Sequence, residues 1–97
     1  MSSLRLDPPS HSGSRDQAQK LLQSLPTDLS GRPVILDCTR MDVSSPSFLD
    51  EMVKEVLVLR TAEVLEIGGA SDRARSLLQR AADNRGVSER LRIATKA

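Results

Sequence analysis

Short apolar runs alternate with amphipathic helical patterns along this 97-residue chain. The first run, residues 33–38, opens on a proline, and the second, residues 62–67, ends at Gly68-Gly69. Around them, apolar residues recur at the three- and four-residue spacing of a helix. A helix between two strands acts as a crossover that lets both strands run in the same direction, so the alternation predicts a mostly parallel sheet. We expect one small α/β domain with the order (β)αβαβαβ, a four-stranded, mostly parallel or mixed sheet and three helices.

Each predicted helix begins at a serine, a residue type that caps helix N-termini through its hydroxyl group. Ser14 and Gln17 fit a capping box for a helix over residues 14–25, which a proline then stops. Ser45 precedes a proline at the first helical position, which suits the start of the second helix. A serine also opens the third helix, expected over residues 71–84.

The strand over residues 33–38 is predicted to be buried on both faces. Its apolarity is continuous rather than alternating, which is typical of a parallel strand flanked by helices on both sides. Residues 91–93, in contrast, alternate like a half-exposed last strand. Residues 1–13 predict a flexible tail, in which Leu4–Leu6 can add a short edge strand, and residues 14–97 are expected to form the domain.

Composition favours a cytoplasmic protein. The N-terminal residues contain no apolar run that could serve as a signal peptide. The longest near-continuous apolar stretch, Val56–Leu59, is far too short to cross a bilayer, so we expect no direct membrane insertion. Cys38 is the single cysteine, and nothing about it argues for an oxidising compartment.

The formal net charge of +1 provides no overall field for nucleic acid or for a membrane surface. Residues 71–97, however, carry seven bases against three acids, whereas residues 35–70 carry seven acids against three bases. A solvated face explains this asymmetry, and a patch for an acidic partner or a phosphate is the alternative. Because Phe48 is the single aromatic residue, base stacking is poorly supported and we expect no nucleic-acid partner. Binding of nucleic acid through residues 71–97 would require an affinity that falls steeply with salt.

No motif for catalysis, a metal or a cofactor stands out, so we expect none of the three. His11 is the only histidine and lies in a segment of helix-breaking residues, which disfavours a Ser-His-Asp or Cys-His site. The sequence contains no CxxC or HxxxH pattern for a metal. Gly68-Gly69 lacks the remainder of a phosphate-binding or dinucleotide fingerprint.

The loops at the carboxyl ends of the strands are the expected functional edge of a parallel α/β sheet. One of them runs into Ser47, the second residue of the second predicted helix. A phosphate on Ser47 would add about −1.5 to −2 charges beside two acids and could weaken an interface. The simpler alternative is that the serines cap the helix or are merely small polar residues. The candidate partner-binding residues at this edge are Asp42, Ser44, Ser45, Ser47, Asp50 and Glu51.

Two segments resemble the STAS-like domains of bacteria. Those domains pair an apolar strand that ends in Asp with a serine-rich helix start followed by Phe-x-Asp-Glu, as Val34–Cys38 and Ser45–Glu51 do here. The Ser14-Arg15 helix start, which leads to Ala18 and Leu21-Leu22, is similar to their N-terminal helix. The likeness covers roughly residues 14–94 and implies a small STAS-like fold.

The resemblance implies a phosphorylation switch. In the broader family, which includes anti-sigma factor antagonists, an Asp-Ser-Ser-Gly-type loop opens the second helix. A partner kinase phosphorylates a serine there, and phosphorylation breaks the complex. Ser47 falls at that position, with Ser45, Pro46 and Phe48 in place of the family's Asp, preceding Ser and Gly. The candidate phosphorylation sites are Ser47, Ser45 and Ser44.

The expected function is therefore that of a non-catalytic regulatory module that binds a protein. The resemblance implies an anti-sigma factor or an ATPase-fold kinase as the partner. The alternative is a constitutive STAS-like subunit of a larger assembly, such as an ABC transporter complex, which needs no phosphorylation.

Overall fold

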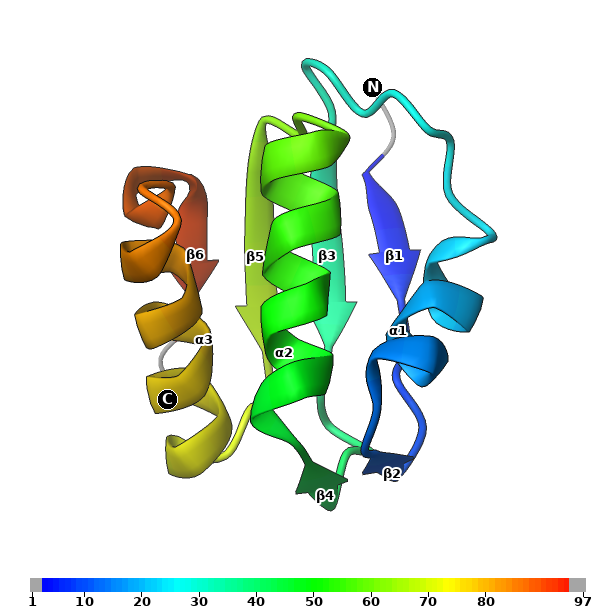
Figure 1. Ribbon diagram of the computed structural model, residues 1–97, viewed down its shortest axis with the longest axis vertical. Helices are drawn as coiled ribbons and strands as arrows, with labels where there is room; N and C mark the ends of the chain where they lie inside the picture. Colours follow the sequence, from blue (N-terminus) through cyan, green and yellow to red (C-terminus); the bar gives the residue numbers. More distant parts are fainter. Residues whose placement is uncertain (1–2, 95–97) are drawn as a thin grey trace.

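The computed structural model describes residues 3–94, and Figure 1 shows its elements in chain order. Strands and helices alternate along most of the chain. They are β1 (Leu4–Leu6), β2 (His11–Ser12), α1 (Arg15–Leu22), β3 (Pro33–Asp37), β4 (Val43–Ser44), α2 (Pro46–Val53), the π-helix η1 (Lys54–Leu59), β5 (Val64–Gly68), α3 (Asp72–Asn84), the 3-10 helix η2 (Ser88–Arg90) and β6 (Leu91–Ile93).

Within residues 3–94, four strands form one sheet in the order β1-β3-β5-β6. Every neighbouring pair is parallel, as the pairing of Leu36 with Ile67 illustrates. A second, two-stranded parallel sheet joins β2 to β4 below the carboxyl ends of the main strands (Figure 1). The prediction of a small α/β domain with three helices and a mostly parallel four-stranded sheet is confirmed.

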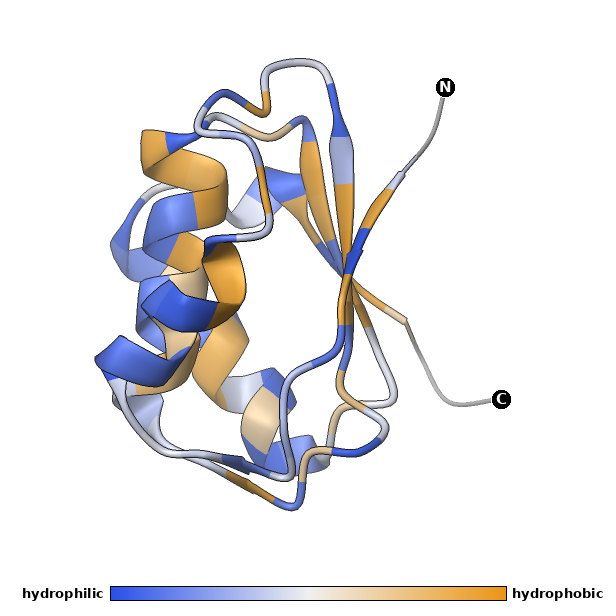
Figure 2. Ribbon diagram, turned by 90° about the vertical axis from the view of Figure 1, so that its right-hand side faces the viewer, coloured by the Kyte–Doolittle hydropathy of each residue, from blue (hydrophilic) through white to orange (hydrophobic). Residues whose placement is uncertain are grey.

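The helices cover one face of the sheet, so the prediction that β3 is buried on both faces is wrong. Figure 2 shows α1, α2 and α3 together on the same side. In β3, Val34 and Leu36 are fully buried, whereas Ile35 is only partly covered. Register places Arg5, Ile35, Glu66 and Arg92 opposite one another on the uncovered face. A β-branched residue such as Ile35 favours a strand without requiring full burial, which is why the apolar run was misleading.

The core lies between the sheet and the helices. Its largest fully buried side chains are Phe48, Leu22, Leu29, Leu36, Leu49, Met52, Leu57, Leu65, Ile67 and Leu78. The segment predicted as a tail also belongs to the fold within the described residues. Leu4–Leu6 forms the edge strand β1, Leu6 is buried in the core, and Pro8 and Ser12 are buried as well.

Serine caps begin all three helices. The hydroxyl oxygens of Ser14, Ser45 and Ser71 accept backbone N–H groups three residues ahead, at 3.1, 3.0 and 3.2 Å. Gln17 does not close the predicted capping box, because its side chain bonds Gly13 and His11 instead. These caps agree with the helix starts expected from the sequence.

Two helix ends are set by arginines from distant parts of the chain. Helix α1 ends at Leu22, three residues before the predicted end, and Arg60 Nη1 donates to the Leu22 carbonyl at 3.0 Å. The π-helix η1 directly continues α2, and its π hydrogen-bonding pattern was not predicted from the sequence. There, Arg90 Nη2 donates to the Leu57 carbonyl at 2.9 Å, and Thr61 follows with a φ of 55°. Carbonyls at helix ends lack helical partners, so these guanidinium donors stabilise them.

Candidate functional site

The loops that follow β3 and β5 meet at one edge of the molecule, where α2 begins (Figure 1). The N-terminal segment positions this start. The backbone N–H of Asp42 donates to the Ser10 carbonyl at 2.9 Å, and that of Ser45 donates to the Ser12 carbonyl at 2.9 Å. The start of α2 is therefore held by β2, which the sequence had placed in a tail.

The three candidate serines have different surroundings. Ser44 is buried, and its carbonyl accepts a hydrogen bond from Arg73 Nη1 at 2.8 Å. The Ser45 hydroxyl oxygen caps α2 by accepting from Phe48 N. Ser47 is half-buried, and its hydroxyl makes no hydrogen bond to any residue of the described range 3–94. Among these serines, Ser47 has the side chain best placed to react or to bind.

Asp50 connects all three helices. It accepts from Arg85 at the end of α3, with Nε at 3.0 Å and Nη2 at 2.7 Å, and from Arg15 Nη1 at 3.1 Å. Arg15 Nη1 also lies 3.0 Å from Glu51 Oε1, so one guanidinium bridges two carboxylates that are adjacent in sequence. We call Arg15, Asp50, Glu51 and Arg85 the helix clamp.

Glu51 is a buried member of the helix clamp, with 4% of its surface exposed. Lys54 Nζ lies 3.0 Å from its carboxylate, and Gln19 donates to it as well. Burial raises the pKa of Glu51, but the hydrogen bonds from Lys54, Gln19 and Arg15 outweigh it and leave the pKa below its usual value. In the folded chain, both acids of this helix start are thus engaged within the molecule, while Asp42 is exposed.

The helix clamp predicts a loss of stability in acid. Hydrogen bonds from Arg85 hold the pKa of Asp50 below its ordinary 3.8. Because the folded-state pKa is the lower one, this stabilisation is complete above the unfolded-state pKa and is lost as the pH falls through the folded-state pKa. We expect the free energy of unfolding to decrease below about pH 4, as measured by urea denaturation from pH 7 to pH 3.

An Asp50→Asn variant is the control for this pH dependence. It should be about 1–2 kcal/mol less stable than the wild type at pH 7, because a neutral amide replaces the charged carboxylate that accepts these hydrogen bonds. Its stability should fall less steeply in acid than that of the wild type. Equal slopes for the two proteins would show that Asp50 does not contribute to acid unfolding.

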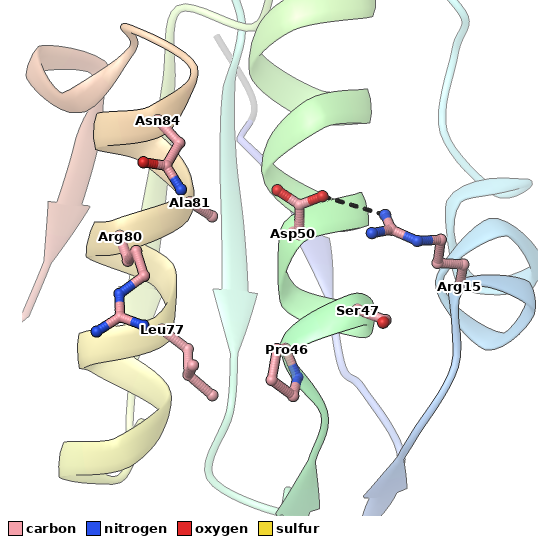
Figure 3. Close-up of a pocket in the computed structure, with 8 residues that line it drawn as sticks. All are labelled: Arg15, Pro46, Ser47, Asp50, Leu77, Arg80, Ala81 and Asn84. Carbon is pink, nitrogen blue, oxygen red and sulfur yellow. Dashed lines mark hydrogen bonds and ion pairs between the residues drawn. The ribbon is translucent and has the colours of Figure 1, made fainter.

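A groove of about 260 Å³ lies beside the start of α2. Figure 3 shows the α3 residues on one side of α2 and Arg15 on the other. The residues that line the groove are Arg15, Pro46, Ser47, Asp50, Leu77, Arg80, Ala81 and Asn84. The groove therefore combines an apolar floor with cationic, carboxylate, hydroxyl and amide groups, a composition that can hold a side chain or segment of a partner.

Most of the groove was not predicted from the sequence. Ser47 and Asp50 were expected at a functional edge, but Arg15 and the α3 residues were not assigned to it. The basic character of residues 71–97 was the one signal that pointed to Arg80 and Arg85. Separations of more than 30 residues, such as that between Arg15 and Asp50, leave no periodic pattern in the sequence.

Other chemistry finds little support in the described residues. Within residues 3–94, no group of three or more His, Cys, Asp or Glu side chains could hold a metal ion. Burial raises the pKa of the Cys38 thiol to about 12, which keeps it protonated and unreactive at neutral pH. None of the helices in residues 3–94 has the length and hydropathy of a membrane-spanning segment.

Comparison of the chain with protein-family models, curated proteins and solved structures gave no match.

Proposed function

We propose that this protein is a non-catalytic regulatory module that binds a protein partner, in the manner of anti-sigma factor antagonists, and that phosphorylation of Ser47 switches it. The partner would be an anti-sigma factor or an ATPase-fold kinase in the bacterial cytoplasm. The observation that carries the proposal is the Ser47 hydroxyl, which has no hydrogen bond within residues 3–94 and lies beside a groove containing Arg15 and Arg80. Ser45 and Ser44 are weaker candidates, because Ser45 caps α2 and Ser44 is buried.

A phosphate on Ser47 would change the surface more than the fold. Ser47 lies three and four residues before Asp50 and Glu51, so the three side chains share one side of α2. The phosphate would add about −1.5 to −2 charges there and compete with both carboxylates for Arg15. A phosphate at a helix N-terminus is itself favourable. The folded domain should therefore persist while the charge of the groove is reversed.

Substitution of Ser47 tests the switch. We expect Ser47→Asp to reduce recovery of the partner at least about tenfold, because one added negative charge changes the pattern of charges on the surface to which the partner binds. Ser47→Ala should retain the partner. The measurement is affinity purification from the native host, with partners quantified by mass spectrometry. The matched control is Ser24→Asp, which adds the same charge at an exposed serine beyond α1. Equal losses with Ser24→Asp and Ser47→Asp would contradict a specific switch.

The uncovered sheet face supports a second candidate function, a constitutive STAS-like subunit of a larger assembly such as an ABC transporter complex. Parallel sheets usually have both faces covered. Here, the face that contains Arg5, Ile35, Glu66 and Arg92 has no helix over it within the described residues (Figure 2). A permanent neighbour could cover it. This function predicts co-purification with a membrane ATPase that binds wild type, Ser47→Ala and Ser47→Asp equally.

A further inference from the structure

Arg80 is the exposed cation of the groove whose charge is not neutralised. It forms no ion pair or side-chain hydrogen bond with any residue of the described part of the chain. The other groove arginine, Arg15, is shared between Asp50 and Glu51. On the same helix, Arg75 pairs with Asp72. Arg80 is therefore available to an anionic group from outside the molecule.

The residues around Arg80 form a continuous stripe along α3. Leu77, Ala81 and Asn84 follow one another at helical spacing and line the groove together with Pro46 of α2. From residue 77 to residue 84, the stripe extends about 10 Å, or two helical turns. Its floor is aliphatic, and Arg80 and Asn84 supply N–H donors at the α3 side (Figure 3). Guanidinium and amide donors are suited to a carboxylate.

The size of the groove favours a side chain over a free small molecule. Its volume of about 260 Å³ is smaller than most ligand pockets, which span about 300–1,000 Å³. A space of this size fits an aliphatic side chain or two. A stripe that is two turns long between neighbouring helices matches the way an amphipathic helix docks, by anchoring every third or fourth residue in a groove.

We propose that the groove between α2 and α3 docks an amphipathic helix of the partner, with an aliphatic side chain on Leu77 and Ala81 and an adjacent Asp or Glu against Arg80. This inference rests on the proposed function, because it specifies the chemistry of the partner. It also gives a physical basis for the switch. A phosphate on Ser47 would bring a second anion into the same groove and repel the carboxylate of the partner.

A pair of model peptides tests this chemistry. The probe is a stapled helical peptide with Leu at positions i, i+4 and i+7 and Glu at the flanking positions, and its counterpart has Lys in place of each Glu. Binding is followed by ¹⁵N chemical-shift titration of the full chain. The Glu peptide should shift the amide signals of Ser47, Leu77, Arg80 and Ala81. Arg80→Glu should weaken binding of the Glu peptide at least about tenfold and strengthen binding of the Lys peptide.

Arg92→Glu is the matched control. It reverses the same charge on the uncovered sheet face and should leave binding of the Glu peptide unchanged. The proposal is overturned if both peptides bind equally, if the shifts map to the sheet face, or if neither peptide binds. It is also overturned if the same signals broaden with protein concentration alone, because a second copy of the chain would then occupy the groove. Displacement of the peptide by a short oligonucleotide would overturn it as well, because the groove would then bind a nucleic acid.

Failure of the docking chemistry differs from failure of the proposed function. If the native partner responds to Ser47→Asp but binds Arg80→Glu normally, the switch stands and the α2–α3 groove is not the docking site. If Arg80→Glu releases the native partner and Ser47→Asp does not, the groove assignment stands and the phosphorylation switch is wrong.

Discussion

A Phe48→Ala substitution is expected to lower the free energy of unfolding by about 3–5 kcal/mol. Phe48 is completely buried and is the largest of the fully buried side chains. It is also the only aromatic residue, so the remaining core consists of aliphatic side chains and sulfur-containing residues. Neighbours of this kind cannot fill the space of a missing ring without moving helices, and a cavity would remain. Urea denaturation monitored by far-UV circular dichroism measures the loss.

Leu59→Ala is the control for Phe48→Ala. Leu59 ends the π-helix that continues α2, and 60% of its surface is exposed. Its truncation should change stability by no more than about 0.5 kcal/mol. If Phe48→Ala lowers the free energy of unfolding by less than about 1 kcal/mol, Phe48 does not have a core role, and its ring would be available to a partner. The burial of Phe48 matters for function, because it leaves Ser47 as the accessible member of this adjacent pair.

Gly69→Ala is expected to destabilise the fold by about 3 kcal/mol through two separate effects. Gly69 has a φ of 68°, a conformation that is strained for any residue with a Cβ atom. A Cβ atom here would also lie 2.5 Å from Thr39 Oγ1 and 3.0 Å from Thr39 N. Thr39 cannot retreat easily, because its N–H donates to Asp37 Oδ1 at 3.0 Å. Thermal and urea unfolding measure the effect.

Gly31→Ala separates the two effects. Gly31 has a similar φ of 74°, but an added Cβ atom would meet nothing within 4 Å. Its substitution should cost only the backbone strain, about 1 kcal/mol. The difference between the losses of stability in the two variants measures the energetic cost of the contact between the added Cβ atom and the closely packed loops after β3 and β5. Equal losses would show that these loops do not constrain each other.

Local signals in the sequence were sufficient to predict most elements of the fold. Ser45 and Ser71 cap the helices that they were expected to begin. Alternation of strands and helices was enough to predict a parallel sheet. Capping, turn conformation and apolar periodicity depend on residues within one or two turns of each other, so they can be recognised in a single sequence.

The functional surface required contacts between distant residues. The serine-rich start of α2 was visible in the sequence, but its relation to Arg15 and Arg80 was not, because these residues lie on other helices. The sequence predicted Asp50 as a partner-binding residue, but it could not indicate the hydrogen bonds that Asp50 accepts from Arg85 and Arg15. Long, flexible arginine side chains can reach many sites, and the packing of the helices selects one of them.

Local patterns in the chain specified where the three main helices begin, which serines cap them, that the four-stranded sheet is parallel and which residues can enter a core. Three-dimensional packing specified that the helices share one face of the sheet, that Arg60 and Arg90 end helical segments, and that Arg80 and Ser47 line one groove, in which Arg80 has no ion pair within residues 3–94. The physical reason is the range of the interactions. Helix caps, turns and torsional preferences act between near neighbours in sequence, whereas burial, ion pairing and hydrogen bonds between distant segments depend on distances that exist only after the layers have packed.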